Sequence, residues 1–490
     1  MKGKSYSFDS SPDRTLGRKV ALGAMFSLVS QCILLCIQVL STSLLARLLL
    51  PEDFGLVALS TTFTGLIAIF RDLGLSMATL QKENLTHQQV TNLFWLNLGS
   101  SLFLSLIIAL CAPFIASFYD DPRLTGITIV SGFSLIIAGL TVQHQALMRR
   151  EMKFKLLAIV DVVSKFIGSA TAILWAYFTE SYWALVFMPI ISAAFYAIAV
   201  WVFCSWRPSL FRRGAGTMQM LHFGKDMLHY GVVNYFARNA DNFIVGKVAG
   251  STELGYYSRS YSLMLMPIGQ LVSPLTGVVV SALSKLQNRP ADFKRYYLEI
   301  IRVLSVISFA IVSAMLVMSD EIIDIFLGPQ WEGAKKIFTI LCFAAFWQPL
   351  QSTMGWVQTS LGHTARMVKW GYINSVSLIV AFLIGCFYGA TGVAIAYSVY
   401  TWLIVIPCFS FTFRDSPIRV KDMLPSISVP LVFTIISTGL ILMLKSVFHF
   451  EELWIRTLFF GGLFVAVWCV YFFLIDKRVV RRFLNLIRHK

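Results

Sequence analysis

Charged residues are scarce in this chain. Only 13% of its 490 residues are Asp, Glu, Lys or Arg, whereas 57% are hydrophobic. A soluble globular domain carries about 25% charged and roughly 45–50% apolar residues. This deficit of charge excludes a soluble enzyme, a disordered chain and a fibrous protein. It indicates that lipid surrounds most of the chain.

Motifs for metal ions, disulfides and nucleotides are also missing. The eight Cys form no C-x-x-C pair and lie mostly in or beside apolar runs, which favours buried thiols over a zinc site or a disulfide framework. No H-E-x-x-H motif occurs. Gly3-Lys4-Ser5 lacks the upstream Gly of a P-loop. We therefore expect no metal site, no cofactor and no ATPase activity.

Long apolar runs dominate instead. A membrane-spanning helix needs about 20 mainly apolar residues. The sequence predicts fourteen spans, at 20–45, 54–80, 90–112, 124–147, 156–178, 182–203, 227–249, 255–282, 299–319, 337–361, 368–388, 391–412, 424–444 and 453–475. The predicted fold class is therefore all-α, a polytopic membrane protein.

Basic residues gather in alternate loops. The set of loops that includes both tails holds most Lys and Arg, among them Arg149, Arg150 and Lys153. The opposite loops hold few bases, diluted by acids such as Glu52 and Asp120. Because positive charge marks cytoplasmic loops, this asymmetry predicts both termini in the cytoplasm. It also accounts for the net charge of +16 without a nucleic-acid partner.

The chain contains an internal repeat. Residues 47–56 and 247–256 lie 200 positions apart and share a base, an acid, an apolar residue and a Gly in the same order. Repeats of this kind are typical of secondary transporters built from two lobes. We predict a tail (1–19), an N-terminal lobe of six helices (20–203), an inter-lobe loop (204–226), a C-terminal lobe of six helices (227–412), two extra helices (413–475) and a basic tail (476–490).

Polar residues inside the spans form stripes, and such residues usually face a cavity or a partner because charge in a membrane is costly. The stripe residues are Gln31, Gln38, Arg71, Asp72, Asn234, Arg238, Asp241, Arg259, Gln270, Gln348 and Gln351. Spans one, two, seven and eight are repeat-equivalent pairs, so we expect these stripes to face one central cavity.

A structural role is the alternative for several of these charges. The alternative for Arg71 with Asp72, and for Arg238 with Asp241, is a structural ion pair within or between helices. Lys165 has Asp161 one turn before it, which also predicts a structural pair.

Arg259 differs, because no acidic residue lies three or four positions from it. This spacing favours a cargo role for its guanidinium.

Several motifs resemble one family. Residues 45–60, which include Pro51-Glu52-Asp53-Phe54-Gly55, look like the first loop of bacterial polysaccharide exporters. Residues 81–83 with 93–97, residues 146–154, residues 255–259 and residues 326–331 match further signatures in order. The chain resembles the colanic-acid-exporter type of lipopolysaccharide biosynthesis protein, in the multidrug/oligosaccharidyl-lipid/polysaccharide exporter superfamily.

The resemblance implies a flippase. Its cargo would be polyprenyl-diphosphate-linked oligosaccharide repeat units, moved by alternating access from the inner to the outer leaflet of the bacterial cytoplasmic membrane for surface polysaccharide biosynthesis. The resemblance also implies contacts with membrane lipids, a polysaccharide polymerase and a chain-length regulator.

The stripes can be assigned roles for this cargo. Diphosphate binding would fall to Arg71, Arg238 and Arg259, because guanidinium groups bind phosphate in a bidentate fashion. Ion coupling would fall to Asp72 and Asp241. Sugar contacts would come from Gln31, Gln38, Asn234, Gln270, Gln348 and Gln351.

Two other functions compete with this reading. An ion-coupled exporter of small drug-like molecules would use the same fold, but the stripes hold Arg as often as acid, which suits an anion. A membrane-bound polymerase or glycosyltransferase would need a large outer loop or a D-x-D motif, and the sequence has neither. We therefore expect a transporter and no enzyme.

Overall fold

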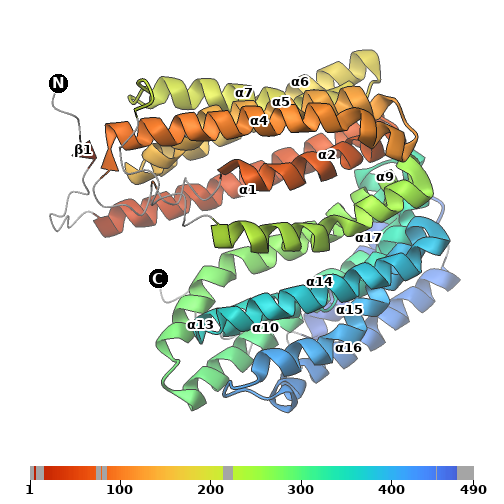
Figure 1. Cartoon of the computed structure of the whole chain (residues 1–490). Coiled ribbons are helices and arrows are strands. Elements are labelled where there is room, and N and C mark those ends of the chain that lie inside the picture. Colours follow the sequence, from red (N-terminus) through yellow and green to blue (C-terminus); the bar gives the residue numbers. More distant parts are fainter. Residues whose placement is uncertain are drawn as a thin grey trace. The chain divides into compact units, whose positions relative to one another are not determined.

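The computed structural model describes residues 5–6, 16–72, 79, 85–212, 225–448 and 450–471, and nearly all of them are helical (Figure 1). The chain divides into two compact units, Met1–Gly255 and Tyr256–Lys490. The all-α prediction is confirmed. The division falls inside one long helix, whereas the predicted lobes are separated at 204–226, and those lobe boundaries stay a prediction.

The first unit is a layer of long antiparallel helices. Its helices are α1 (Leu16–Leu48), α2 (Pro51–Asp72), α4 (His87–Tyr119), α5 (Arg123–Arg150), α6 (Phe154–Thr179), α7 (Trp183–Phe203) and the first part of α9 (Lys225–Lys285). Helix α5 packs against α2, α4 and α7, and α6 packs against α1 and α7. A short ladder joins β1 (Ser5–Tyr6) antiparallel to β2 (Leu85–Thr86).

The second unit continues the pattern with shorter pieces. After the second part of α9 come α10 (Pro290–Val317), α11 (Ser319–Phe326), η1 (Pro329–Trp331), α12 (Glu332–Ala345), α13 (Gln348–Ser360), α14 (Thr364–Gly385), η2 (Cys386–Tyr388), α15 (Gly389–Phe413), α16 (Val420–Val447) and α17 (Leu453–Val470). Helix α15 packs against α12, α13 and α14, while α10 packs against α16.

Eleven helical segments among the described residues are long and apolar enough to cross a membrane. Two of them, Arg238–Lys285 and Thr364–Phe413, cover two predicted spans each. The predicted spans therefore fall on helices. Two of them have ends outside the described residues, namely 73–78 and 80 of the span at 54–80, and 472–475 of the span at 453–475.

One predicted span is not a single helix. The sequence predicts one span at 337–361, but the structure has α12 and α13 with a break at Phe346 and Trp347. Pro349 explains the break. A proline has no amide N–H, and its ring would clash with the carbonyl group four residues earlier, which is that of Ala345, the last residue of α12.

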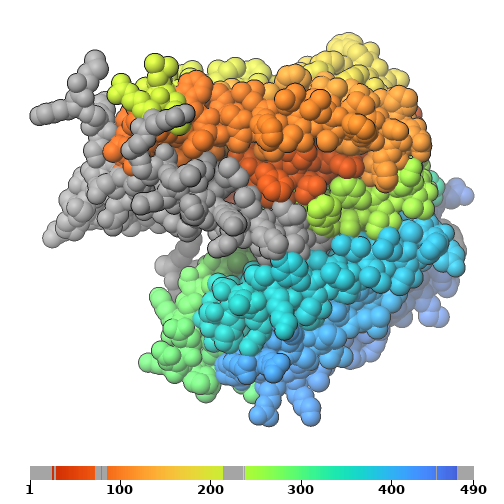
Figure 2. Space-filling view, viewed as in Figure 1, coloured from red at the N-terminus to blue at the C-terminus, as the bar shows by residue number. Residues whose placement is uncertain are grey.

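Lipid-facing surfaces are apolar. On α4 a row of large side chains recurs at helical spacing and is exposed: Leu102, Phe103, Leu106, Leu110 and Phe114. Figure 2 shows the side chains of α4 on the surface of the first unit in this view. In a water-soluble protein such a patch would be unusual, and in a bilayer it faces hydrocarbon chains.

The segment after α7, at the start of the predicted inter-lobe loop, is held by α4. Trp95 donates its indole N–H to the carbonyl oxygen of Ser209 at 2.8 Å. Asn92 donates to the carbonyl oxygen of Arg212 at 2.7 Å and accepts from that residue's amide at 3.1 Å. One face of α4 therefore satisfies backbone groups of a segment that has no regular structure of its own.

Charge at one end of the second unit is arranged as a network. Glu321 of α11 is 1% exposed, and its two carboxylate oxygens lie 2.9 Å from Lys445 Nζ and 2.7 Å from Arg456 Nε. Asp324 pairs with Lys335 at 2.9 Å. This network ties α16 and α17, which were predicted as extra helices, to α11 of the same unit.

The repeat loops meet within the first unit. Helix α9 is kinked at Gly250, whose φ of 84° lies in the left-handed region that favours glycine. A new helical turn therefore starts at Ser251. In the same way, α2 starts at the repeat-equivalent Pro51. A Cβ added to Gly55 would lie 1.8 Å from the carbonyl oxygen of Ser251. A Cβ added to Gly255 would lie 1.9 Å from the carbonyl oxygen of Pro51.

These two contacts are reciprocal. Residue 55 approaches residue 251, and residue 255 approaches residue 51 in the same way. Such a reciprocal pair of contacts is expected where two repeat-equivalent segments are related by a two-fold axis. Small residues allow the two backbones to approach this closely. The glycine shared by the two predicted repeat loops is therefore required by packing.

We expect Gly55→Ala and Gly255→Ala to destabilise the protein strongly. Each new methyl group meets a backbone carbonyl that cannot move away without separating α2 from α9. Gly99→Ala is the matched control, because nothing lies within 4 Å of a Cβ at this helical position.

The measurement is membrane abundance, together with the temperature of unfolding in detergent. The two crossing variants should fall well below wild type, and Gly99→Ala should match it or exceed it. Equal behaviour of all three variants would contradict the packing argument.

Candidate functional site

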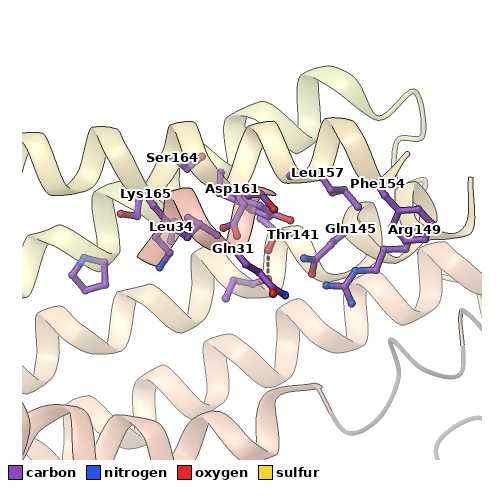
Figure 3. Close-up of a pocket in the computed structure, with 17 residues that line it drawn as sticks. Gln31, Leu34, Thr141, Gln145, Arg149, Phe154, Leu157, Asp161, Ser164 and Lys165 are labelled. Atoms are coloured by element: carbon purple, nitrogen blue, oxygen red, sulfur yellow. Dashed lines mark hydrogen bonds between the residues drawn. The ribbon is translucent and has the colours of Figure 1, made fainter. Parts of the chain in front are cut away.

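A polar cavity of about 480 Å³ lies within the first unit, between α1, α5, α6 and α7 (Figure 3). This volume falls in the range of about 300–1,000 Å³ that is usual for small-molecule sites. The lining residues are Ser30, Gln31, Leu34, Ala138, Thr141, Gln145, Arg149, Phe154, Leu157, Ala158, Asp161, Ser164, Lys165, Pro189, Ser192, Ala193 and Tyr196.

Helical periodicity places these polar groups together. Thr141, Gln145 and Arg149 follow one another at intervals of four on α5 and so share one face. Asp161 and Lys165 share the facing side of α6. Arg149 lies near the end of α5, so the cavity reaches the short connection between α5 and α6.

Three charged side chains line the cavity. In Figure 3, Arg149 lies beside Gln145 at one end, Lys165 lies toward the other end, and Asp161 and Gln31 lie between them. Within the described part of the chain, none of Arg149, Asp161 and Lys165 forms an ion pair. The predicted structural pair of Lys165 with Asp161 is therefore wrong.

The physical reason is the cavity itself. Arg149 and Lys165 are exposed and Asp161 is half-buried. An unpaired charge in an apolar interior is very costly, but charges at an open polar cavity can be satisfied by water or by a bound molecule. The site has two cationic groups, one carboxylate, two amides and several hydroxyl groups. This set suits the binding of a polar molecule, and the described residues hold no group of three or more potential metal ligands.

The predicted site residues of the first unit are dispersed. Gln31 lines the cavity, Gln38 is exposed on α1, and Arg71 is half-buried at the end of α2. The side chains of Asp72 and Asn234 lie outside the described residues.

Arg238 and Asp241 differ in burial. Arg238 is exposed on α9, whereas Asp241 is 3% exposed and one of its carboxylate oxygens accepts the amide of Asn242 at 2.9 Å. Asp241 has a further interaction beyond this hydrogen bond, and the roles predicted for Arg238 and Asp241 stay predictions.

The other predicted residues belong to the second unit. Gln348 donates to the hydroxyl of Tyr397 at 2.5 Å, and Gln351 donates to the carbonyl oxygen of Thr401 at 3.2 Å, so both join α13 to α15. Gln270 is exposed on α9.

Arg259 is half-buried on the same helix and is not without an interaction. Its predicted cargo role stays a prediction. Because the stripe residues divide between the two units, their common central cavity stays a prediction.

Sequence reasoning missed most of the observed cavity. The signal was present, because Thr141 and Gln145 in span four form a polar stripe with Arg149 just after it, and Asp161 and Lys165 form another in span five. The search followed the repeat-equivalent spans one, two, seven and eight, and so it found only Gln31 among the lining residues.

The many apolar helices of spanning length place the chain among multi-pass membrane proteins, and a polar cavity among such helices is a feature that transport proteins have. The polysaccharide biosynthesis protein family matches residues 44–336, more than half of the chain. The chain therefore belongs to this family.

Individual relatives are distant but extensive. The lipopolysaccharide biosynthesis protein WzxC of Escherichia coli (strain K12) is 20% identical over 386 residues, which cover 78% of each chain. The succinoglycan biosynthesis transport protein ExoT of Rhizobium meliloti (strain 1021) is 21% identical over 351 residues, covering 71% of this chain and 70% of its own.

Among solved structures, the lipid II flippase MurJ in an inward closed conformation matches with a TM-score of 0.73 at 14% identity, covering 94% of this chain and all of that chain. This likeness shows the fold. Together with the family match it confirms the resemblance to polysaccharide exporters, and the chain is a transport protein of polysaccharide biosynthesis.

If the cavity takes part in transport, filling it should block transport. Ala158→Phe places a ring in the cavity from α6. Val163→Phe is the matched control, because Val163 lies on the same helix, is 48% exposed and does not line the cavity.

We expect Ala158→Phe to reduce surface polysaccharide several-fold at equal membrane abundance, with Val163→Phe at the wild-type level. Quantified polysaccharide per amount of membrane protein is the measurement. Equal export by both variants would remove the cavity from the transport route.

Proposed function

We propose that the chain is a flippase that moves polyprenyl-diphosphate-linked oligosaccharide from the inner to the outer leaflet of the bacterial cytoplasmic membrane. The main support is its membership of the polysaccharide biosynthesis protein family, combined with a fold like that of a lipid II flippase. The polar cavity adds support, because a sugar head group needs polar contacts while it is below the bilayer surface.

The chemistry divides the cargo into two parts. The polyprenyl tail stays in the hydrocarbon, whereas the diphosphate and the sugars must cross it, which is costly without a polar route. In this proposal Arg71, Arg238 and Arg259 neutralise the diphosphate, since a guanidinium binds phosphate in a planar, bidentate geometry. Gln31 and the cavity residues contact sugar.

Transport against a gradient needs an energy source. The membrane potential supplies about 2.3 kcal/mol per charge per 100 mV. Asp241, buried at 3% exposure, and Asp72 are the proposed coupling carboxylates. The two predicted lobes, 20–203 and 227–412, would alternate access to the two sides.

The proposed orientation follows from charge. Both termini lie in the cytoplasm in this proposal, because the basic loops are on their side. A polymerase and a chain-length regulator would receive the cargo on the outer side. Export of small drug-like cations fits less well, because two of the three charged groups in the cavity are cationic.

Deletion of the gene tests the cargo. We expect surface polysaccharide to disappear and lipid-linked repeat units to accumulate at the inner face, because their assembly continues without the flipping step. Loss of the polymerase alone is the control and should instead leave single repeat units at the outer face. Normal polysaccharide in a deletion strain that has no parallel exporter would overturn the proposal.

A reporter fusion tests the orientation. We expect a fusion after Lys490 to be active on the cytoplasmic side, because the basic tail belongs to the positive set of loops. A fusion within the acidic loop at Asp120 should be active on the opposite side. Activity of the Lys490 fusion outside the cell would exclude the even number of spans.

A further inference from the structure

We propose that the cavity between α1, α5, α6 and α7 binds a sugar that carries a carboxylate group, and that the guanidinium of Arg149 binds this carboxylate. The proposal rests on the proposed function, because it specifies the chemistry of the head group that the flippase takes up. No residue from the diphosphate assignment is part of it.

The first argument is the state of the basic residues around the α5–α6 connection. Arg150 donates to the carbonyl oxygen of Thr79 at 3.0 Å. Lys153 pairs with Glu151 at 2.6 Å. Both of these cations contact other groups of the protein. Arg149 lines the cavity, is solvent-exposed and has no ion pair within the described residues, so its guanidinium is available to a bound anion.

The second argument is the balance of charge. Arg149 and Lys165 provide two positive charges and Asp161 provides one negative charge, so the lining has a net charge of +1 that favours an anion over a cation. Arg149 lies at one end beside Gln145 in Figure 3, where a planar carboxylate can accept from both side chains. A guanidinium matches a carboxylate better than an ammonium does, which favours Arg149 over Lys165.

The third argument is the presence of acceptors. The hydroxyl of Thr141 donates to the carbonyl oxygen of Ala138 at 2.8 Å, so its lone pairs are left to accept. Asp161 is also an acceptor, and Gln31 has both functions. Sugar hydroxyl groups donate to such acceptors.

A phospholipid phosphate fits this site less well. A phosphate diester and a uronate each bring one negative charge, which Asp161 repels to a similar extent. The diester group itself has acceptor oxygens and no donor, whereas the sugar also brings hydroxyl groups that can donate to Asp161. The mixture of one carboxylate with two cations therefore favours a hydroxyl-rich molecule with a single acid.

Size and position agree with this ligand. The cavity of about 480 Å³ suits a small molecule. It reaches the α5–α6 connection, which belongs to the loops predicted to face the cytoplasm, where the cargo is made. An acidic sugar would therefore meet Arg149 as the head group enters.

Glucuronate and glucuronamide are the probes, because they have nearly the same shape and differ only at the acid group, which is a charged carboxylate in one and a neutral amide in the other. The full-length protein in nanodiscs is titrated with each probe by saturation-transfer NMR. We expect glucuronate to bind at least about tenfold more tightly than glucuronamide, because a hydrogen bond to a charged partner is stronger than one between neutral groups.

Three variants locate the effect. Arg149→Gln should remove the preference for glucuronate, and Arg149→Lys should keep part of it, because the charge remains while the planar fork is lost. Lys155→Gln is the control. Lys155 is exposed, lies over the ring of Phe26 and does not line the cavity, so its removal should leave the preference intact. Unfolding temperatures in detergent confirm that each variant is folded.

Four outcomes would overturn the proposal: equal binding of glucuronate and glucuronamide, no binding of either, a preference that survives Arg149→Gln, or stronger binding of glycerol 3-phosphate than of glucuronate. The last would assign the cavity to a lipid head group. Each of these leaves the flippase function intact if the wild-type gene restores surface polysaccharide to a deletion strain. Failure of that restoration, in contrast, counts against the flippase itself.

Discussion

The absence of water in the bilayer is the constraint on which the rest of this structure depends. A backbone N–H or C=O that faces hydrocarbon has no solvent to pair with, so each spanning segment must satisfy its own groups as a helix. One predicted span is interrupted, because Pro349, which has no amide N–H, separates α12 from α13. Outside this break, the described parts of the spans are helical.

The same constraint sorts the charged side chains into two groups. Glu321, which is almost completely buried, has both Lys445 and Arg456 as partners, so its charge serves to join α11, α16 and α17. Removing one member of such a buried group is costly because the remaining charge loses its partner. Arg149 and Asp161 belong to the other group, since they face a cavity where water or cargo can satisfy them. In a transporter, charged residues of the second group are the candidates for contact with the cargo.

Close packing of small residues gives the first unit its architecture. Gly55 and Gly255 let the starts of two repeat-equivalent helical turns cross with their backbones in contact. Helix α6 approaches α7 in a similar way at Gly168, where a Cβ would lie 1.9 Å from Ser192 Oγ, and Ser192 lines the cavity. In a membrane, packing of this kind replaces much of the hydrophobic driving force that holds soluble helices together. The cavity is therefore framed by helices whose separation is set by glycine and serine.

The sequence by itself determined the all-α class, the positions of the spans and the family, because hydrophobic length and ordered loop motifs are local properties of the chain. It also marked Gly55 and Gly255 as equivalent. Only the tertiary structure decided which polar stripes share a cavity. Thr141, Gln145 and Arg149 meet Asp161 and Lys165 because α5 and α6 present these faces to the same space. The spacing of Asp161 and Lys165 alone predicted an ion pair, since a helical repeat fixes which side chains share a face but leaves open what that face meets.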